Sequence, residues 1–246
     1  MPENRVVVIT GSAGGMGRLL VDRFANNGDI VVATDVKQEP LDKLRSQFEG
    51  RATVVAVAAD ISSERDCQRI ADVARDKAGR VDVLINCAGF FPMKPFEEIT
   101  LEEWRRVIDI NLTSVFLLTK AVLPLMKGRG WGRIVNISSA SIFEGVADQT
   151  HYVAAKAGVI GLSRSLARAF GKHGITVNVV TPGLTVTPPV KEKMPAQLLE
   201  AQIASRAIPR EERPEDLVGA VFFLASRDAD FVSGQTINVD GGKHML

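Results

Sequence analysis

The chain has 246 residues, of which 46% are hydrophobic and 24% charged, a balance typical of globular proteins rather than disordered ones. Thirty basic residues against twenty-nine acidic ones leave no overall field that would hold nucleic acid or an anionic membrane. The basic run over residues 127–133 is expected to form a solvated turn. Two cysteines are too few for a disulfide framework or a zinc site, so we expect no metal.

The start of the chain shows no secretory pattern of a charged region, an apolar stretch and a cleavage site. No window offers eighteen uninterrupted apolar residues, which argues against a membrane span. We therefore expect a cytoplasmic protein.

Short β-branched runs alternate with helical patterns along the chain, which is typical of parallel strands joined by crossover helices. We predict strands over residues 5–10, 30–34, 53–58, 81–86, 133–138, 176–181 and 235–239. The first crossover helix covers about residues 15–27 and is stopped by Gly28. The sequence thus predicts one domain over residues 1–246, an α/β Rossmann-like doubly wound parallel sheet of about seven strands with helices on both faces.

Longer helical patterns cover residues 101–127 and 154–172, with apolar residues on more than one face. The segment 184–214 breaks the rhythm because it holds five prolines around a short helical stretch near residues 196–205. Long insertions after a strand of such a sheet often contact ligands, so we expect a substrate lid at about 184–214. A surface excursion without a binding role is the alternative.

A glycine-rich turn, Thr-Gly-Ser-Ala-Gly-Gly-Met-Gly over residues 10–17, follows the first strand and opens the first helix. Such a turn lets backbone N–H groups approach a pyrophosphate at the positive end of a helix. The turn is not a P-loop, because Arg18 stands where the Gly-Lys-Ser/Thr would have to continue. A plain tight turn is the alternative for the glycines alone. The predicted dinucleotide contacts in the turn are Gly11, Ser12, Gly14, Gly15, Met16 and Gly17.

Acidic residues end the next two predicted strands. Asp35, followed by Val36, is close to the position at which a carboxylate bonds the adenosine ribose hydroxyls and repels a 2′-phosphate. We therefore predict NAD rather than NADP, although Lys37 would offset part of the repulsion. Asp60, followed by Ile61, either faces the adenine or caps the next helix.

Tyr152 is the only tyrosine, and Lys156 lies four residues further on. On a helix the two side chains share one face, so an ammonium would lie near the phenol and stabilise the phenolate. The alternative is a chance pair, since this spacing is common on helices. Ser139, at the end of the fifth predicted strand, is placed to hydrogen-bond a reacting oxygen.

At this point the chain resembles the short-chain dehydrogenases/reductases (SDR), and the resemblance covers essentially its whole length. The turn at 10–17 is similar to the family's cofactor motif, and Asn86-Cys87-Ala88-Gly89 is similar to its Asn-Asn-Ala-Gly, with Cys87 as a departure. The positions that match the family's catalytic residues are Asn111, Ser139, Tyr152 and Lys156. Further positions implied to bind the cofactor are Asn86, Ala88, Gly89, Pro182, Gly183, Thr185 and Thr187.

The resemblance implies an NAD-type enzyme that moves hydride between nicotinamide and a secondary alcohol or ketone. It further implies that Lys156 binds the nicotinamide ribose, that Asn111 holds a water in a proton relay, and that the protein is a homotetramer. An apolar, cyclic or aryl substrate is expected from the predicted pocket residues. These residues are Phe91, Met93, Ser141, Ile142, Phe143, Leu184 and Met194.

Three other interpretations compete with this one. A 3-oxoacyl-carrier-protein reductase fits the whole-chain pattern, but the family's use of NADP for that reaction conflicts with Asp35. A dinucleotide-binding protein without turnover conflicts with the intact Ser139, Tyr152 and Lys156. A serine hydrolase is rejected because the chain lacks a Gly-x-Ser-x-Gly elbow.

Overall fold

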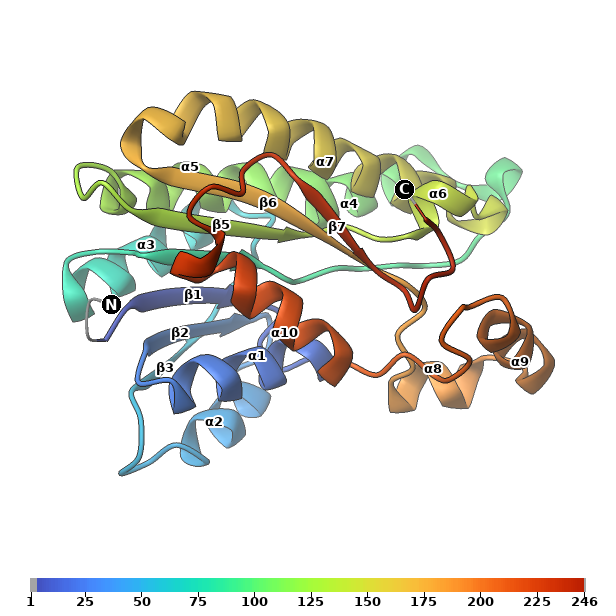
Figure 1. The fold of residues 1–246 in the computed structure, drawn as a ribbon, viewed down its shortest axis with the longest axis horizontal. Coiled ribbons are helices and arrows are strands. Elements are labelled where there is room, and N and C mark those ends of the chain that lie inside the picture. Colours follow the sequence, from blue (N-terminus) through green and yellow to red (C-terminus); the bar gives the residue numbers. More distant parts are fainter. Residues whose placement is uncertain (1–3, 246) are drawn as a thin grey trace.

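The computed structural model describes residues 4–245, which form a single parallel sheet with helices on both faces (Figure 1). Its order is β3-β2-β1-β4-β5-β6-β7. The strands are β1 (Val6–Thr10), β2 (Ile30–Asp35), β3 (Val54–Ala58), β4 (Val83–Asn86), β5 (Gly132–Ile137), β6 (Ile175–Pro182) and β7 (Thr236–Val239). The predicted sheet and its seven strands are confirmed, with strand ends shifted by at most two residues.

The order in which strands are added to the sheet changes direction next to β1. From β1 it runs outward through β2 to β3, then returns to start β4 on the other side of β1. At such a switch point the connections that leave the two neighbouring strands run in opposite directions. A crevice therefore opens beyond the carboxyl ends of these strands. The fold therefore places a ligand crevice where β1 and β4 end.

Helices cover both faces of the sheet, as the continuous apolar strands require. One face packs against α1 (Gly15–Asn26), α2 (Gln38–Ser46) and α10 (Glu215–Leu224). The other packs against α3 (Glu64–Ala78), α5 (Ser114–Met126) and α7 (Thr150–Phe170). All five residues of β1 are buried, which fits its central place between the two layers.

The helical run predicted over 101–127 is divided into three parts. A capping box of Thr100 and Glu103 starts α4 (Leu101–Ile108), which continues as a π-helical turn, η2 (Asp109–Thr113), and then as α5. By length and composition the run Leu101–Met126 could cross a membrane. In this fold its residues Leu118, Val122 and Met126 are fully buried against the sheet.

The helix predicted over 154–172 starts four residues earlier, at Thr150, ends at Phe170 and is followed by a 3₁₀ turn, Gly171–His173. The segment 184–214 contains α8 (Pro188–Lys193) and α9 (Ala196–Ala204), which stand away from the sheet in Figure 1. The remaining short elements are α6 (Ser141–Glu144) and 3₁₀ turns at Phe96–Glu98, Ala147–Gln149 and Arg227–Ala229.

The prediction of a solvated turn over 127–133 is wrong at its end. Gly132 begins β5, and the Arg133 side chain is almost fully buried. Its guanidinium donates hydrogen bonds to Ser226 O and Gly132 O and pairs with Asp230. These partners satisfy the charge, which is why an arginine can lie inside the protein here.

Candidate active site

The glycine-rich turn lies between β1 and α1, and its glycines are required by close backbone contacts. Gly11 has φ +67, and a side-chain carbon there would come within 2.9 Å of Ala88 Cα. A side-chain carbon on Gly17 would overlap the carbonyl of Gly11. At both positions glycine is required because a side chain would strike the protein's own backbone, so the turn can stay tight at the N-terminus of α1, where it lines the crevice.

Gly17→Ala should damage this turn. The new methyl group would force the Gly11 carbonyl to move, and such overpacking costs about 1–3 kcal/mol of unfolding free energy. Urea unfolding followed by circular dichroism measures the loss. Gly219→Ala is the matched control, because Gly219 lies in helix α10 with nothing within 4 Å of an added carbon. It should be neutral or slightly stabilising, and equal losses in the two variants would contradict the explanation.

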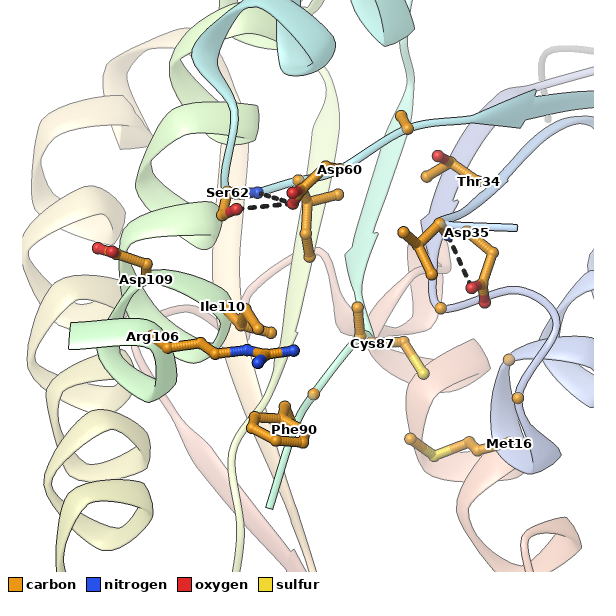
Figure 2. Close-up of a pocket in the computed structure, with 18 of the residues that line it drawn as sticks. Met16, Thr34, Asp35, Asp60, Ser62, Cys87, Phe90, Arg106, Asp109 and Ile110 are labelled. Atoms are coloured by element: carbon orange, nitrogen blue, oxygen red, sulfur yellow. Dashed lines mark hydrogen bonds between the residues drawn. The ribbon is translucent and has the colours of Figure 1, made fainter. Parts of the chain in front are cut away.

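Asp35 is fixed at the end of β2 and points toward the turn. Its carboxylate accepts hydrogen bonds from Ala13 N at 3.0 Å and from Val36 N at 2.8 Å (Figure 2). The backbone therefore holds the charge at the edge of the crevice. This is the position that the sequence predicts for contact with a ribose.

A cavity of about 1100 Å³ opens beyond the ends of β1, β2, β3 and β4. Its walls include most of the predicted cofactor residues. These are Gly11, Gly14, Gly15, Met16, Gly17, Asp35, Val36, Asp60, Ile61, Ala88 and Gly89. Figure 2 shows Met16 and Asp35 on one side of this cavity, with Asp60, Ile110 and Arg106 facing them across Cys87.

Among the contacts predicted in the glycine turn and at the end of β4, Ser12 and Asn86 lie outside the cavity. Ser12 is completely buried, and its hydroxyl donates to Ile9 O at 2.8 Å, so it stabilises the turn from behind. The Asn86 amide donates to Asn136 Oδ1 at 2.8 Å and joins β4 to β5 inside the sheet. Neither side chain lines the cavity, because each already meets a partner in the core.

The sequence gives little sign of the wall formed by α4. Residues on the exposed side of this helix line the cavity. One of them, Arg106, places its guanidinium over the Phe90 ring, 5.2 Å from the ring centroid. The lining residues that the prediction missed are Thr34, Ala59, Ser62, Cys87, Phe90, Leu101, Glu102, Arg105, Arg106, Asp109 and Ile110. Helical spacing could have grouped the polar ones on one side of α4, but it does not show what that side faces.

Tyr152 and Lys156 come together one turn apart on α7. Lys156 Nζ is 5.7 Å from the centroid of the Tyr152 ring and donates a hydrogen bond of 2.9 Å to Ile137 O. The lysine is almost fully buried, and burial lowers its pKa to about 8. It therefore remains mostly cationic at neutral pH beside the phenol.

Asn111 approaches the same lysine from the π-helical turn. Its amide donates to Val107 O and Phe90 O, and its Oδ1 accepts from Phe90 N at 3.1 Å. A side-chain carbon on Gly89 would lie 3.3 Å from Asn111 Oδ1 and 3.5 Å from Lys156 Nζ. The asparagine and the lysine thus converge on Gly89, at the end of the cavity nearest to Tyr152. Extra residues in π-helical turns are frequent at functional sites.

Ser139 completes the group after β5. Burial raises the pKa of Tyr152 to about 12, and hydrogen bonding with Ser139 offsets part of that rise. The lowering of the tyrosine pKa that was expected from Lys156 is not seen in the protein alone, where burial dominates. The backbone N–H of Ser141 donates to Ser139 Oγ at 3.2 Å and orients the hydroxyl.

The predicted substrate residues come from several separate segments, and one of them contacts Tyr152. The Phe91 ring lies edge-on to Tyr152 at 6.3 Å, while Met93 is 63% exposed. Ser141, Ile142 and Phe143 form most of α6, Leu184 follows β6, and Met194 follows α8. Phe91 is therefore the predicted substrate residue that the structure places beside the phenol.

The stretch after β6 was predicted to bind the nicotinamide end of the cofactor. Pro182 ends β6 in the core, and Gly183 packs closely against Asp240. Thr187 lies beside Gly15 of the turn, since a carbon added to Gly15 would approach its methyl at 3.1 Å. The Thr185 hydroxyl is instead bonded to Glu212 Oε1 at 2.7 Å.

Comparisons with known proteins agree with this arrangement. A family model described as enoyl-(acyl carrier protein) reductase matches residues 11–244. The chain is 36% identical over 241 residues to a 3-oxoacyl-acyl-carrier-protein reductase of Thermotoga maritima, with 98% of each chain covered. It is 39% identical over 239 residues to a cis-4-hydroxycyclohexanecarboxylate dehydrogenase of Sinomonas cyclohexanicum, covering 97% of this chain and 96% of the relative.

A solved structure shares the fold closely. It is a short-chain dehydrogenase/reductase of Brucella melitensis, described as a glucose/ribitol dehydrogenase. The TM-score is 0.94 at 33% sequence identity, with 99% of this chain and 98% of that chain covered. Matches of this extent show that the chain belongs to the short-chain dehydrogenase/reductase family and is an oxidoreductase acting on alcohol or ketone groups.

Proposed function

We propose that the protein transfers hydride between NAD and a secondary alcohol or ketone, with Tyr152 as the acid/base group. One observation carries the proposal. Tyr152 lies beside Ser139 and beside a buried lysine that reaches Gly89 in the wall of a cavity, and the glycine turn and Asp35 belong to the same cavity.

The residues of the cavity fit a dinucleotide. The turn lines the cavity with four glycines, which bring no side chain against a pyrophosphate, and the N-terminus of α1 favours such an anion. Asp35 would hold the adenosine ribose, and Lys156 the nicotinamide ribose. When bound, the nicotinamide ring accepts or donates the hydride.

The protein's own residues handle the proton and the substrate oxygen. Ser139 orients that oxygen, and Tyr152 takes the hydroxyl proton during oxidation or returns it during reduction. Lys156 favours the phenolate through its charge, because an adjacent cation stabilises an anion in a partly desolvated site. Asn111 supports transfer of the proton between Lys156 and solvent.

The substrate is proposed to be apolar, with a cyclic or aryl secondary alcohol preferred. The exposed Phe91 ring lies against Tyr152, and Met93, two residues further on, is exposed as well, so both offer apolar surface. The Sinomonas relative's name specifies a cyclic alcohol, which supports this class. Reduction of a 3-oxoacyl thioester is the second candidate, favoured by the Thermotoga relative and the matched family model.

A direct assay separates the two candidates. We expect purified protein to form NADH from NAD and cyclic secondary alcohols such as cis-4-hydroxycyclohexanecarboxylate, with slower oxidation of NADPH by acetoacetyl-CoA. Absorbance of the reduced cofactor measures both. Faster turnover with acetoacetyl-CoA and NADPH would favour the second candidate, and cofactor binding without turnover of either substrate class would favour a non-catalytic protein.

The remaining proposals concern organisation. We propose that residues 1–246 act as one domain, that residues 184–214 close over the substrate, and that the protein is a cytoplasmic homotetramer. The position of α8 and α9 beyond the sheet, beside the loop that carries Thr187, supports the lid.

A further inference from the structure

A buried carboxylate holds the segment that leaves β6 and runs toward the glycine-rich turn. The Thr185 hydroxyl donates a hydrogen bond of 2.7 Å to Glu212 Oε1. The backbones meet at the same point, because Val186 N donates to Glu212 O at 2.7 Å. Glu212 therefore makes two hydrogen bonds to this segment, one at Thr185 and one at Val186. The next residue, Thr187, lies beside Gly15.

Arg206 holds the same segment from another side. Its guanidinium donates to Leu184 O at 2.9 Å and to Arg210 O at 2.9 Å. The charge of Arg206 lies 3.9 Å from Glu212 Oε2, and both side chains are almost fully buried. Two buried ionisable residues thus brace one short stretch of backbone, although burying charge is costly unless it is paired.

Glu212 lies behind the segment and does not line the cavity. Any influence on a bound cofactor must therefore pass through this segment, and the side-chain hydrogen bond to Thr185 is the direct link from the carboxyl group. That backbone leads to Thr187, on the side of the glycine turn where the nicotinamide is proposed to lie. A shift of the segment would alter contacts with that end of the cofactor and leave the adenosine end, held at Asp35, unchanged.

We propose that Glu212 is a positioning residue that, through Thr185, fixes residues 183–187 against the nicotinamide half of the bound cofactor. The inference rests on the proposed function, since it assumes a dinucleotide in the cavity. The inference adds to the cofactor site a residue that is remote from Tyr152, Lys156 and Ser139. It also explains why Glu212 and Arg206 are buried as a pair.

The hydrogen bond at Thr185 needs an acceptor and does not need a charge. Arg206, Arg210 and Asp240, itself bonded to His244, face the carboxyl group. Burial raises the pKa of Glu212 to about 7, so the site already accommodates a neutral side chain near neutral pH. Glutamine keeps an amide oxygen at this position, whereas alanine removes the acceptor.

The test compares binding of NADH with binding of ADP-ribose, which lacks the nicotinamide, by isothermal titration. Glu212→Ala should weaken NADH binding about tenfold, the effect of losing one buried hydrogen bond. ADP-ribose affinity should stay within about twofold, because its contacts lie at the adenosine end. Glu212→Gln should restore NADH affinity close to that of the unchanged protein.

A double-mutant cycle shows whether Glu212 acts through Thr185. Thr185→Val should weaken NADH binding as much as Glu212→Ala, and the double variant should be no weaker than either single one. Thr185→Val also serves if Glu212→Ala does not fold. Glu211→Ala is the matched control, because the neighbouring carboxylate pairs with Lys191 at the surface, and it should bind NADH normally.

Several outcomes would overturn the inference. They are unchanged NADH affinity in both single variants, an equal loss of NADH and ADP-ribose affinity, and additive effects in the double variant. A lower melting temperature with unchanged NADH affinity would reduce Glu212 to a structural role. If the unchanged chain bound neither NADH nor NADPH, the proposed function would fail together with the inference, so the two failures are distinguishable.

Discussion

Tyr152→Phe should lower turnover by about 10²- to 10⁴-fold, the usual contribution of a positioned acid/base group. The variant loses only a hydroxyl, so the ring keeps its edge-on contact with Phe91 and the position of α7. NADH affinity should change by less than about twofold, because the phenol oxygen serves the proton transfer and not the cofactor cradle. Steady-state rates and NADH titration measure the two effects.

The pH dependence gives a second readout of the same group. Oxidation requires the phenolate, so its rate at saturating NAD should rise with pH, whereas reduction requires the phenol and should fall at high pH. In the protein alone the pKa of Tyr152 is about 12, and a bound positively charged nicotinamide should lower it. Tyr152 is the only tyrosine, so the ultraviolet absorbance of tyrosinate reports this one group.

Phe143→Leu is a suitable control, since this ring lies on α6 and packs against His244, away from the proton transfer. It should change the KM for bulky substrates more than it changes turnover. Turnover in Tyr152→Phe equal to that of the unchanged protein, or an oxidation rate that does not depend on pH, would contradict the assignment of Tyr152.

The features that the sequence predicts well are those that depend on neighbouring residues. The turn at 10–17 is one example. Close contact with neighbouring backbone allows only glycine at Gly11 and Gly17, so the spacing of glycines in the sequence is enough to predict the turn. The pair Tyr152 and Lys156 is another, since helical spacing alone puts both on one face. The seven strands follow in the same way from their apolar runs.

Features that depend on distant partners escape such prediction. Ser12 and Asn86 were expected in the cofactor site because their neighbours are there, yet their partners Ile9 and Asn136 keep them in the core. The exposed side of α4 becomes a cavity wall only because the fold brings it opposite the turn. The contact between Thr185 and Glu212 spans 27 residues without any sequence pattern to announce it.

Buried charge is the clearest case. Arg133 belongs to a run that resembles a solvated turn, and Arg5 precedes the first strand, yet both are almost fully buried. Arg5 forms hydrogen bonds of 2.8 and 2.6 Å with Asp29 and a further one with Ala225 O. An arginine is stable inside the protein only when such partners exist, and these come from residues up to 220 positions away.

Asp35→Ser should raise the ratio of NADP to NAD efficiency by about 100-fold, equivalent to roughly 2.7 kcal/mol of relative binding energy. The carboxylate cannot swing away from a 2′-phosphate, because Ala13 N and Val36 N hold both of its oxygens. Repulsion between like charges at this partly buried position therefore counts against NADP. Serine removes the charge, and Lys37 next to the site would then attract the phosphate. The values of kcat/KM with each cofactor measure the ratio.

Asp60→Ser is the matched control, because Asp60 also follows a strand, two residues after β3, and lines the same cavity. Its carboxylate accepts hydrogen bonds from the backbone and hydroxyl of Ser62 in the turn before α3, but the cap of that helix is Ser63, so the expectation that Asp60 might cap it is wrong. If Asp60 mainly serves that turn or faces the adenine, its loss weakens both cofactors alike and leaves their ratio within about threefold. An unchanged ratio in Asp35→Ser would place the ribose elsewhere in the cavity. A large change in Asp60→Ser would place the 2′-hydroxyl nearer β3 than β2, since only a carboxylate close to that group can distinguish the two cofactors by charge.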